Sequence, residues 1–169
     1  RGDGNPLVGL FANRGIEIHL YSNTGKVELY NVVSGYTSNA SLLGIVVNRN
    51  ATYSGFAPDV TIDALTPGAQ ASSISSHFGV IIFGGNVEVL STINHRSKAD
   101  GGIQSDEGLY ITSSKSLTIG ANVGGAGTVE LESAGPLTIA GNVLANTWGI
   151  HGGILIDNHA TGAITYDVT

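Results

Sequence analysis

A repeat of 20 residues constrains the fold of this chain more than any other sequence feature. Residues 108–143, GLYITSSKSLTIGANVGGAGTVELESAGPLTIAGNV, contain two copies of one pattern. Within each copy apolar and polar residues alternate, which is typical of short β-strands with one buried face. Five apolar residues return 20 positions later: Leu109, Ile111, Leu117, Ile119 and Val123 correspond to Val129, Leu131, Leu137, Ile139 and Val143.

A pair of such short strands cannot bury its apolar face alone, so each copy needs a neighbour. Copies of equal length can stack in parallel at a spacing of about 4.8 Å, with equivalent residues aligned in one core. We therefore expect an all-β fold, a single parallel β-solenoid over residues 1–169 with roughly seven or eight coils of about 20 residues and loop insertions. The ten repeated residues above are its predicted structural core. A β-sandwich, which also has short alternating strands, is the alternative.

Other parts of the chain carry the same alternation less regularly. Residues 15–33 and 149–168 each contain two short apolar runs, and residues 79–93 contain two runs separated by an expected turn at Gly84 and Gly85. Residues 42–65, LLGIVVNRNATYSGFAPDVTIDAL, contain two strand runs separated by about a dozen loop residues, and the small, polar stretch TPGAQASSISSH, residues 66–77, is expected to be a loop. Loops are the usual carriers of variable function. Possible contact residues on such loops are Asn50, Tyr53, His95, Arg96 and Trp148.

Composition narrows the classes of partner. Seven basic residues against 13 acidic ones give a formal charge of −6, and the basic residues form no cluster, which disfavours nucleic acid and other polyanions. The longest apolar run, residues 79–85, is far shorter than the ~20 residues that span a bilayer, so no membrane insertion is expected. With no cysteine, disulfide and thiolate chemistry are excluded.

The repeat also resembles a known family. The form Gly-x-hydrophobic-x-hydrophobic-x-Ser/Ala-x-x-x-Leu-Thr-Ile in residues 108–143 is similar to the haemagglutinin-type repeats of filamentous-haemagglutinin-like exoproteins, which Gram-negative bacteria export by two-partner secretion. The resemblance implies a long right-handed parallel β-helix at the cell surface or in the medium, acting in adhesion, in biofilm structure or as a stalk. Asn5-Pro6 lacks the Asn-Gly-Ile-type continuation of the family's secretion domain, so the resemblance is to the rod region.

The candidates for chemistry favour no catalytic, cofactor or metal site. The five histidines show no ligand spacing, and the best acidic loop for calcium has only Asp100, Asp106 and Glu107. Glu130 and Glu132 point to one face of a strand, about 7 Å apart, and are the best pair for polysaccharide hydrolysis. The aromatic residues that could line a sugar groove are dispersed: Tyr21, Tyr30, Tyr36, Tyr53, Tyr110, Trp148 and Tyr166. Asn39 and Asn50 begin N-glycosylation sequons, which matter only in a eukaryotic secreted chain.

These observations predict a structural or adhesive extracellular protein with no enzymatic role. It would be a rod segment or filament subunit of a bacterial surface adhesin or matrix fibre, with host-surface or glycan ligands as possible partners. Because a final coil exposes unpaired strand edges, we expect either continuation beyond Arg1 and Thr169 or end-to-end self-association. The alternative is a carbohydrate-binding or polysaccharide-degrading β-helix of the phage tailspike or lyase type.

Overall fold

The computed structural model of the chain is all-β, and its described part contains no helix. It describes residues 10–12, 15–30, 32–34, 45–48, 56–63, 74–76, 79–90, 103–105, 108–125, 127–145, 153–159 and 164–166. Across these ranges, no helix has the length and apolar character needed to traverse a bilayer.

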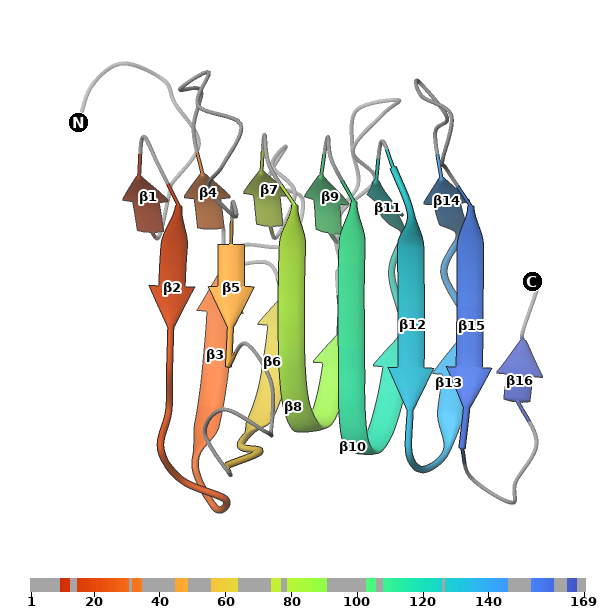
Figure 1. The fold of residues 1–169 in the computed structure, drawn as a ribbon, viewed down its shortest axis with the longest axis horizontal. Helices are drawn as coiled ribbons and strands as arrows, with labels where there is room; N and C mark the ends of the chain where they lie inside the picture. The colour runs from red at the N-terminus through yellow and green to blue at the C-terminus, as the bar shows by residue number, and fades with distance from the viewer. Residues whose placement is uncertain are drawn as a thin grey trace.

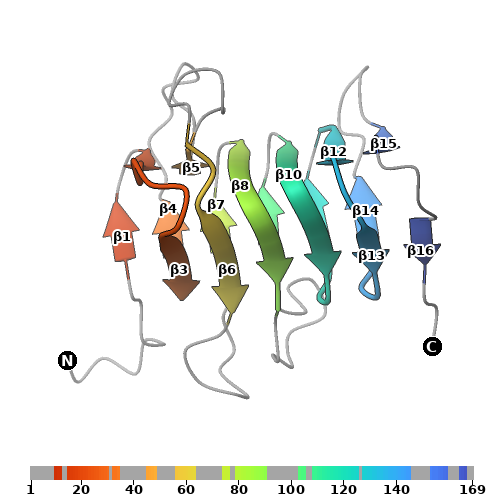
Figure 2. The same ribbon diagram turned by 90° about the horizontal axis from the view of Figure 1, so that it is seen from below.

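The strands stack in three rows, and each row follows the order of the chain from one end of the molecule to the other (Figure 1). The first row is a six-stranded sheet of short strands: β1 (Leu10–Ala12), β4 (Val32–Ser34), β7 (Ile74–Ser76), β9 (Ile103–Ser105), β11 (Val123–Gly125) and β14 (Val143–Ala145). The second row holds β2 (Ile16–Ile18), β5 (Ile45–Val47), the first half of β8 (Val80–Val89), the first half of β10 (Leu109–Ile119), β12 (Val129–Ser133) and β15 (Ile154–Asn158). The third row holds β3 (Lys26–Tyr30), β6 (Asp59–Asp63), the second halves of β8 and β10, β13 (Leu137–Ile139) and β16 (Ile164–Tyr166). Figure 2 shows the same succession from below.

Every pairing between the described strands is parallel, and the predicted register is confirmed. Leu109 pairs with Val129, Leu117 with Leu137 and Val123 with Val143, each 20 residues apart. The predicted 25-residue step from Val129 to Ile154 is also present. None of these described pairs shows the antiparallel pairing that a β-sandwich requires.

The inward residues of all three rows form one hydrophobic core. Leu117, Ile119 and Ile139 are among its fully buried members, because each repeat covers the apolar face of the one before it. Of the ten repeated residues, nine are at most 1% exposed, and Val143 is half-buried in the last repeat. A single continuous core therefore runs through the stacked repeats.

The described strands form six repeats, fewer than the expected seven or eight coils. The reason is the length of the insertions: Val32 and Ile74 are adjacent in the first row although they lie 42 residues apart in sequence. By contrast, Ile103, Val123 and Val143 follow one another at 20 residues. Insertion length thus varies from repeat to repeat while strand register is kept.

The prediction that residues 66–77 form a loop is wrong in part. This segment contains β7, whose Ile74 is fully buried and lies between Val32 and Ile103 in the first row. The two strand runs expected in residues 42–65 correspond to β5 and β6, which pair with both neighbouring repeats. β7 escapes a search for alternation because a strand of three residues shows too little of it.

The turn expected at Gly84 and Gly85 is a corner inside a continuous strand, β8. Both glycines are buried, and a Cβ at Gly85 would lie 2.6 Å from the carbonyl oxygen of Ala57. The register between β8 and β10 shifts here, so that Ser113 pairs with Gly84 but Ser116 pairs with Asn86. The extra residue on β10 forms a bulge, which lets the strand bend from the second row into the third.

Candidate functional site

The contacts that join one repeat to the next are the best-defined polar features of the structure. Asn48, at the end of β5, is 1% exposed and has a positive φ of 47°. Its Oδ1 accepts a hydrogen bond from Leu20 N at 2.9 Å, and its Nδ2 donates to Phe83 O at 3.5 Å. Because Leu20 belongs to the repeat before and Phe83 to the repeat after, one buried side chain joins three repeats.

A second joint lies at the corner between the second and third rows. Asp59 Oδ1 accepts hydrogen bonds from the backbone N of Asn86 at 2.9 Å and from its Nδ2 at 3.0 Å. Lys115 Nζ, from the bulge of β10, lies 3.8 Å from the same oxygen. Ser116 Oγ is 2.8 Å from Asn86 Oδ1, to which it donates. The network therefore ties the second, third and fourth repeats together.

The hydrogen bond from the Asn86 backbone, with those from Asn86 Nδ2 and the charge of Lys115, lowers the pKa of Asp59. A carboxylate with a lowered folded-state pKa stabilises the fold above its unfolded pKa, near 3.8, and this contribution is lost as the pH falls through the folded value. We expect the chain to lose stability on acidification below about pH 4, and Asp59→Asn to remove part of that pH dependence. Urea unfolding at pH 7 and pH 3 measures both; an unchanged pH slope in Asp59→Asn contradicts the assignment.

Close approach of neighbouring repeats depends on glycine at specific positions. A Cβ added at Gly141 would overlap the backbone carbonyl group of Ala121, one repeat earlier, whereas a Cβ at Gly153 would meet nothing within 4 Å. We expect Gly141→Ala to destabilise the fold by about 1–3 kcal/mol, because the two backbones must separate. Gly153→Ala is the matched control and should leave the melting temperature unchanged or slightly raised. Equal melting temperatures for the two variants would contradict the close approach.

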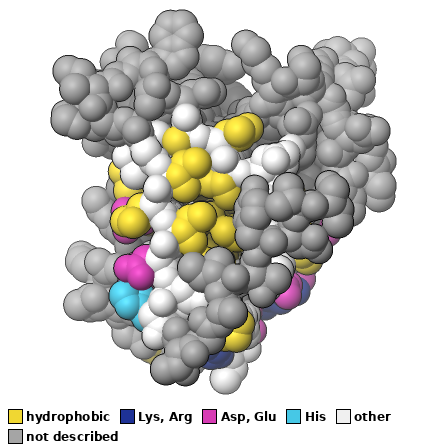
Figure 3. Space-filling view, turned by 90° about the vertical axis from the view of Figure 1, so that its right-hand side faces the viewer, with side chains coloured by type: hydrophobic (Ala, Val, Ile, Leu, Met, Phe, Trp, Pro, Cys, Tyr) yellow, Lys and Arg dark blue, Asp and Glu magenta, His cyan; other side chains and the backbone are white. Residues whose placement is uncertain are grey.

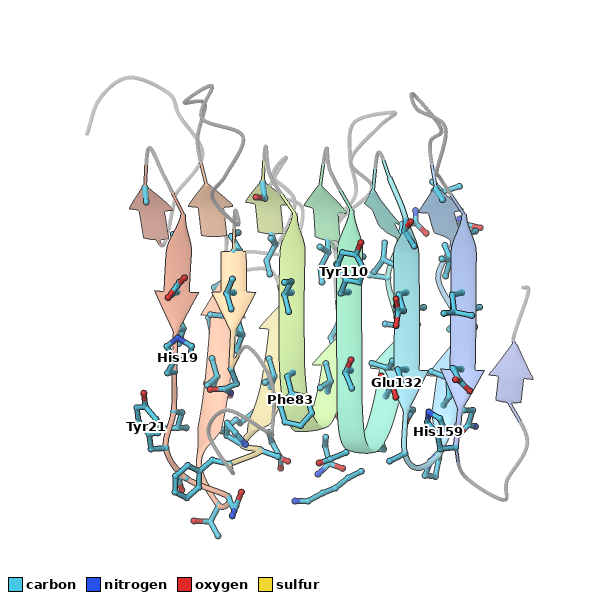
Figure 4. All side chains as sticks on the ribbon, viewed as in Figure 1. His19, Tyr21, Phe83, Tyr110, Glu132 and His159 are labelled. Carbon is cyan, nitrogen blue, oxygen red and sulfur yellow. The ribbon has the colours of Figure 1, made fainter. Side chains whose placement is uncertain are left out.

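One of the two catalytic candidates, Glu132, belongs to a cluster that the sequence did not reveal. Glu132 lies in register with Asp157 of the next repeat, and His159 Nε2 lies 3.0 Å from Glu132 Oε1 and 3.5 Å from Asp157 Oδ2. Thr112 Oγ1 donates to Glu132 Oε2 at 3.4 Å. Glu130, the other half of the predicted pair, lies in register with Tyr110 and Leu155 instead. Figure 4 shows Glu132 and His159 on the outer surface of the second row and just beyond it.

The Glu132 carboxylate of this cluster contacts both neighbouring repeats, through Thr112 and through His159. His159 also donates its backbone N–H to Ser133 O at 2.9 Å, so β15 is fixed against β12 by main chain and side chain together. Within the described residues, no three histidine or acidic side chains are placed to hold a metal ion. The cluster can therefore stabilise the stacking of β12 on β15, and it offers a pair of carboxyl groups on one face.

The last repeat exposes its core-facing side (Figure 3). Ile154 is 49% exposed, whereas Val129, its partner in the same inward column, is fully buried. Leu144 and Leu155 of the same repeat are also exposed, on the outward side of their strands, in register with Gly124 and Glu130. In the first repeat, by contrast, Ile16 is 7% exposed. The two ends of the core therefore differ in how well they are covered.

The predicted contact residues lie outside the described part of the chain, as do the predicted calcium and glycosylation positions. They are Asn50, Tyr53, His95, Arg96 and Trp148, then Asp100, Asp106 and Glu107, and finally Asn39.

Comparison with known proteins gives no relative. No protein-family model, no curated protein and no solved structure matches the chain.

Proposed function

We propose that the chain is a right-handed parallel β-helix that forms a rod-like segment or subunit of an extracellular adhesive filament, without a catalytic role. One observation carries this proposal: the in-register inward columns continue through all six described repeats, while the insertions between strands vary in length. A fold that keeps its core constant and its surface variable is suited to extension and display. The resemblance of residues 108–143 to haemagglutinin-type repeats supports the extracellular, adhesive role.

The mechanical part of the proposal follows from the parallel pairing. Backbone hydrogen bonds between successive repeats run along the stacking direction, so a load along the rod is shared by three strands at each junction. The side chains of Asn48, Asp59 and Glu132 add polar contacts between neighbouring repeats at three places along the stack. The rod is therefore held by joints that repeat along its length.

The exposed side of the last repeat supports growth by one more coil. Ile154 and Ile156 continue the columns of Val129 and Leu131, and a coil with the same apolar spacing would cover them. Such a coil belongs to a continuing polypeptide or to a second subunit that joins end to end by strand addition.

Electron microscopy of the native protein tests the proposed function directly. We expect thin rods or filaments whose width matches a single stack of strands. Compact, isolated particles in native material would overturn the filament proposal. A mass measurement separates its two forms, because a native polypeptide well above 17.3 kDa indicates a segment, and a match to that mass indicates a self-assembling subunit.

A polysaccharide-degrading β-helix is the second candidate, and the cluster of Glu132, Asp157 and His159 favours it. Glycoside hydrolysis needs two carboxyl groups of the enzyme beside the glycosidic bond that is cleaved. Glu132 and Asp157 lie on one face of adjacent strands. The test is release of reducing ends from neutral and acidic polysaccharides. Activity that is lost in Glu132→Gln and kept in Glu130→Gln would establish this candidate, and absence of activity on all substrates would reject it.

A further inference from the structure

Three rings meet at the first two repeats, two of them close in sequence and the third 35 residues further along the chain. Tyr21 and His19 follow β2, and Phe56 precedes β6. The ring centroids of Tyr21 and Phe56 are 6.1 Å apart with an edge-to-face angle of 87°, and those of His19 and Tyr21 are 6.4 Å apart. We call these three residues the aromatic platform. Of the aromatic residues expected to be dispersed, Tyr21 is joined here by two rings outside that set, Phe56 and His19, because the register brings two repeats together.

The central ring of the platform faces solvent. Tyr21 is 69% exposed, the highest value among the exposed large hydrophobic residues of the described part. It is also remote from the exposed side of the last repeat, as Figure 4 shows, so the free end of the core does not explain its exposure. An exposed ring in contact with two further rings presents a face to a ligand.

The turn that carries Tyr21 is held in place by hydrogen bonds. Ser22 Oγ accepts from Thr24 N at 3.2 Å and from Gly25 N at 3.1 Å. Asn23 Oδ1 accepts from Ala57 N at 2.8 Å, next to Phe56 on the neighbouring repeat. The two strand ends that supply the rings are thereby joined. A ligand that binds the platform finds it already formed, which lowers the entropy cost of binding.

Polar groups beside the rings narrow the class of ligand. The Glu17 carboxylate lies 3.7 Å from His19 Nε2, and its side chain is 57% exposed. A tyrosine ring with its hydroxyl, an imidazole and a carboxylate can stack on the C–H face of a pyranose and hydrogen-bond to its hydroxyl groups. A carboxylate at the site and a formal charge of −6 disfavour sugars that carry acid groups. The chemistry fits a neutral saccharide.

We propose that the aromatic platform of His19, Tyr21 and Phe56, together with Glu17, is a binding site for neutral glycans. Tyr21 supplies the stacking face, Phe56 and His19 fix the angle of its ring, and Glu17 accepts hydrogen bonds from sugar hydroxyl groups. This inference deepens the adhesive part of the proposed function and rests on it, because the platform gives a rod a defined ligand class.

Isothermal titration of the full chain with neutral hexasaccharides of glucose and of N-acetylglucosamine tests the site. Polygalacturonate oligomers and sialyllactose serve as acidic comparisons. We expect measurable binding of at least one neutral hexasaccharide, no binding of the acidic sugars, and a loss of about tenfold or more in affinity for Tyr21→Ala, equivalent to about 1.4 kcal/mol. Tyr21→Trp should retain binding because it keeps the stacking face.

Tyr110→Ala is the matched control, since Tyr110 is an exposed tyrosine on β10 outside the platform. It should bind as the unmodified chain does. No binding of neutral sugars, equal binding of acidic sugars, binding of a peptide in their place, or unchanged affinity in Tyr21→Ala would each overturn the proposal. Circular dichroism and electron microscopy of the same samples separate the outcomes, because rods that bind no sugar reject the platform alone and compact particles reject the filament.

Discussion

Replacing Asn48 with alanine is expected to destabilise the fold by about 2–5 kcal/mol, among the largest effects of any single change. The change leaves Leu20 N without its acceptor at 2.9 Å, and it removes the donor that faces Phe83 O. A buried backbone group that loses its partner costs about 1–3 kcal/mol. The positive φ of 47° adds a further cost of about 1–2 kcal/mol, since alanine adopts this conformation poorly.

Two further variants separate these causes. Asn48→Gly removes the same side-chain bonds but tolerates the positive φ, so its loss should be smaller than that of Asn48→Ala by about 1 kcal/mol. Asn122 makes a similar but exposed joint, in which its Oδ1 accepts from Asn142 N at 2.8 Å. Asn122→Ala should therefore cost only about 0.5–1 kcal/mol. Urea unfolding measures all three; equal losses at positions 48 and 122 would show that the buried joint has no special role.

Leu117→Ala is expected to cost about 2–5 kcal/mol, because it opens a cavity in the middle of the core. Leu117 is fully buried and lies in register between Val87 and Leu137. Because Leu117 lies between two repeats, the cavity weakens the packing against both the preceding and the following repeat. The free energy of unfolding, from urea titration followed by circular dichroism, measures the loss.

Thr118→Ala is the control for this prediction. Thr118 is the next residue of the same strand and points to the opposite, outward side, in register with Thr138. Its replacement should change the free energy of unfolding by no more than about 0.5 kcal/mol. If Leu117→Ala and Thr118→Ala were equally mild, the inward column would not be the source of stability.

The repeated core could be predicted from the sequence because its signal is local. Leu117 and Leu137 occupy equivalent positions in two copies of one 20-residue pattern, and the 20-residue period fixes their pairing. The insertion before Ile154 was also readable as a longer step. Where period and alternation are both present, parallel register follows from them.

The first row was harder to predict because each of its strands has three residues. The signal becomes visible only after alignment: the first residue is apolar and the third is small. The third residues are Ala12, Ser34, Ser76, Ser105, Gly125 and Ala145. At Gly125 space explains the small residue, since a Cβ added there would lie 3.0 Å from Gly108 Cα. A search for this apolar-x-small pattern would have found β7.

The polar joints and the aromatic platform could not be predicted because they depend on contacts between repeats of unequal length. His159 reaches Glu132 over 27 residues, and Phe56 reaches Tyr21 over 35. No single spacing along the sequence connects both pairs. Only the register of the strands, once known, places these side chains together.

Engineered disulfides test the in-register parallel stacking most directly, because the chain has no cysteine of its own. Tyr110 and Glu130 are register partners on β10 and β12, so their Cα atoms should lie about 4.8 Å apart, within the range that a disulfide spans. Tyr110 and Glu132 are out of register by two residues, at about 8 Å, beyond that range. Oxidation followed by mass spectrometry should give an intramolecular disulfide in Tyr110→Cys/Glu130→Cys and none in Tyr110→Cys/Glu132→Cys. A disulfide in the second variant but not in the first would contradict the stacking.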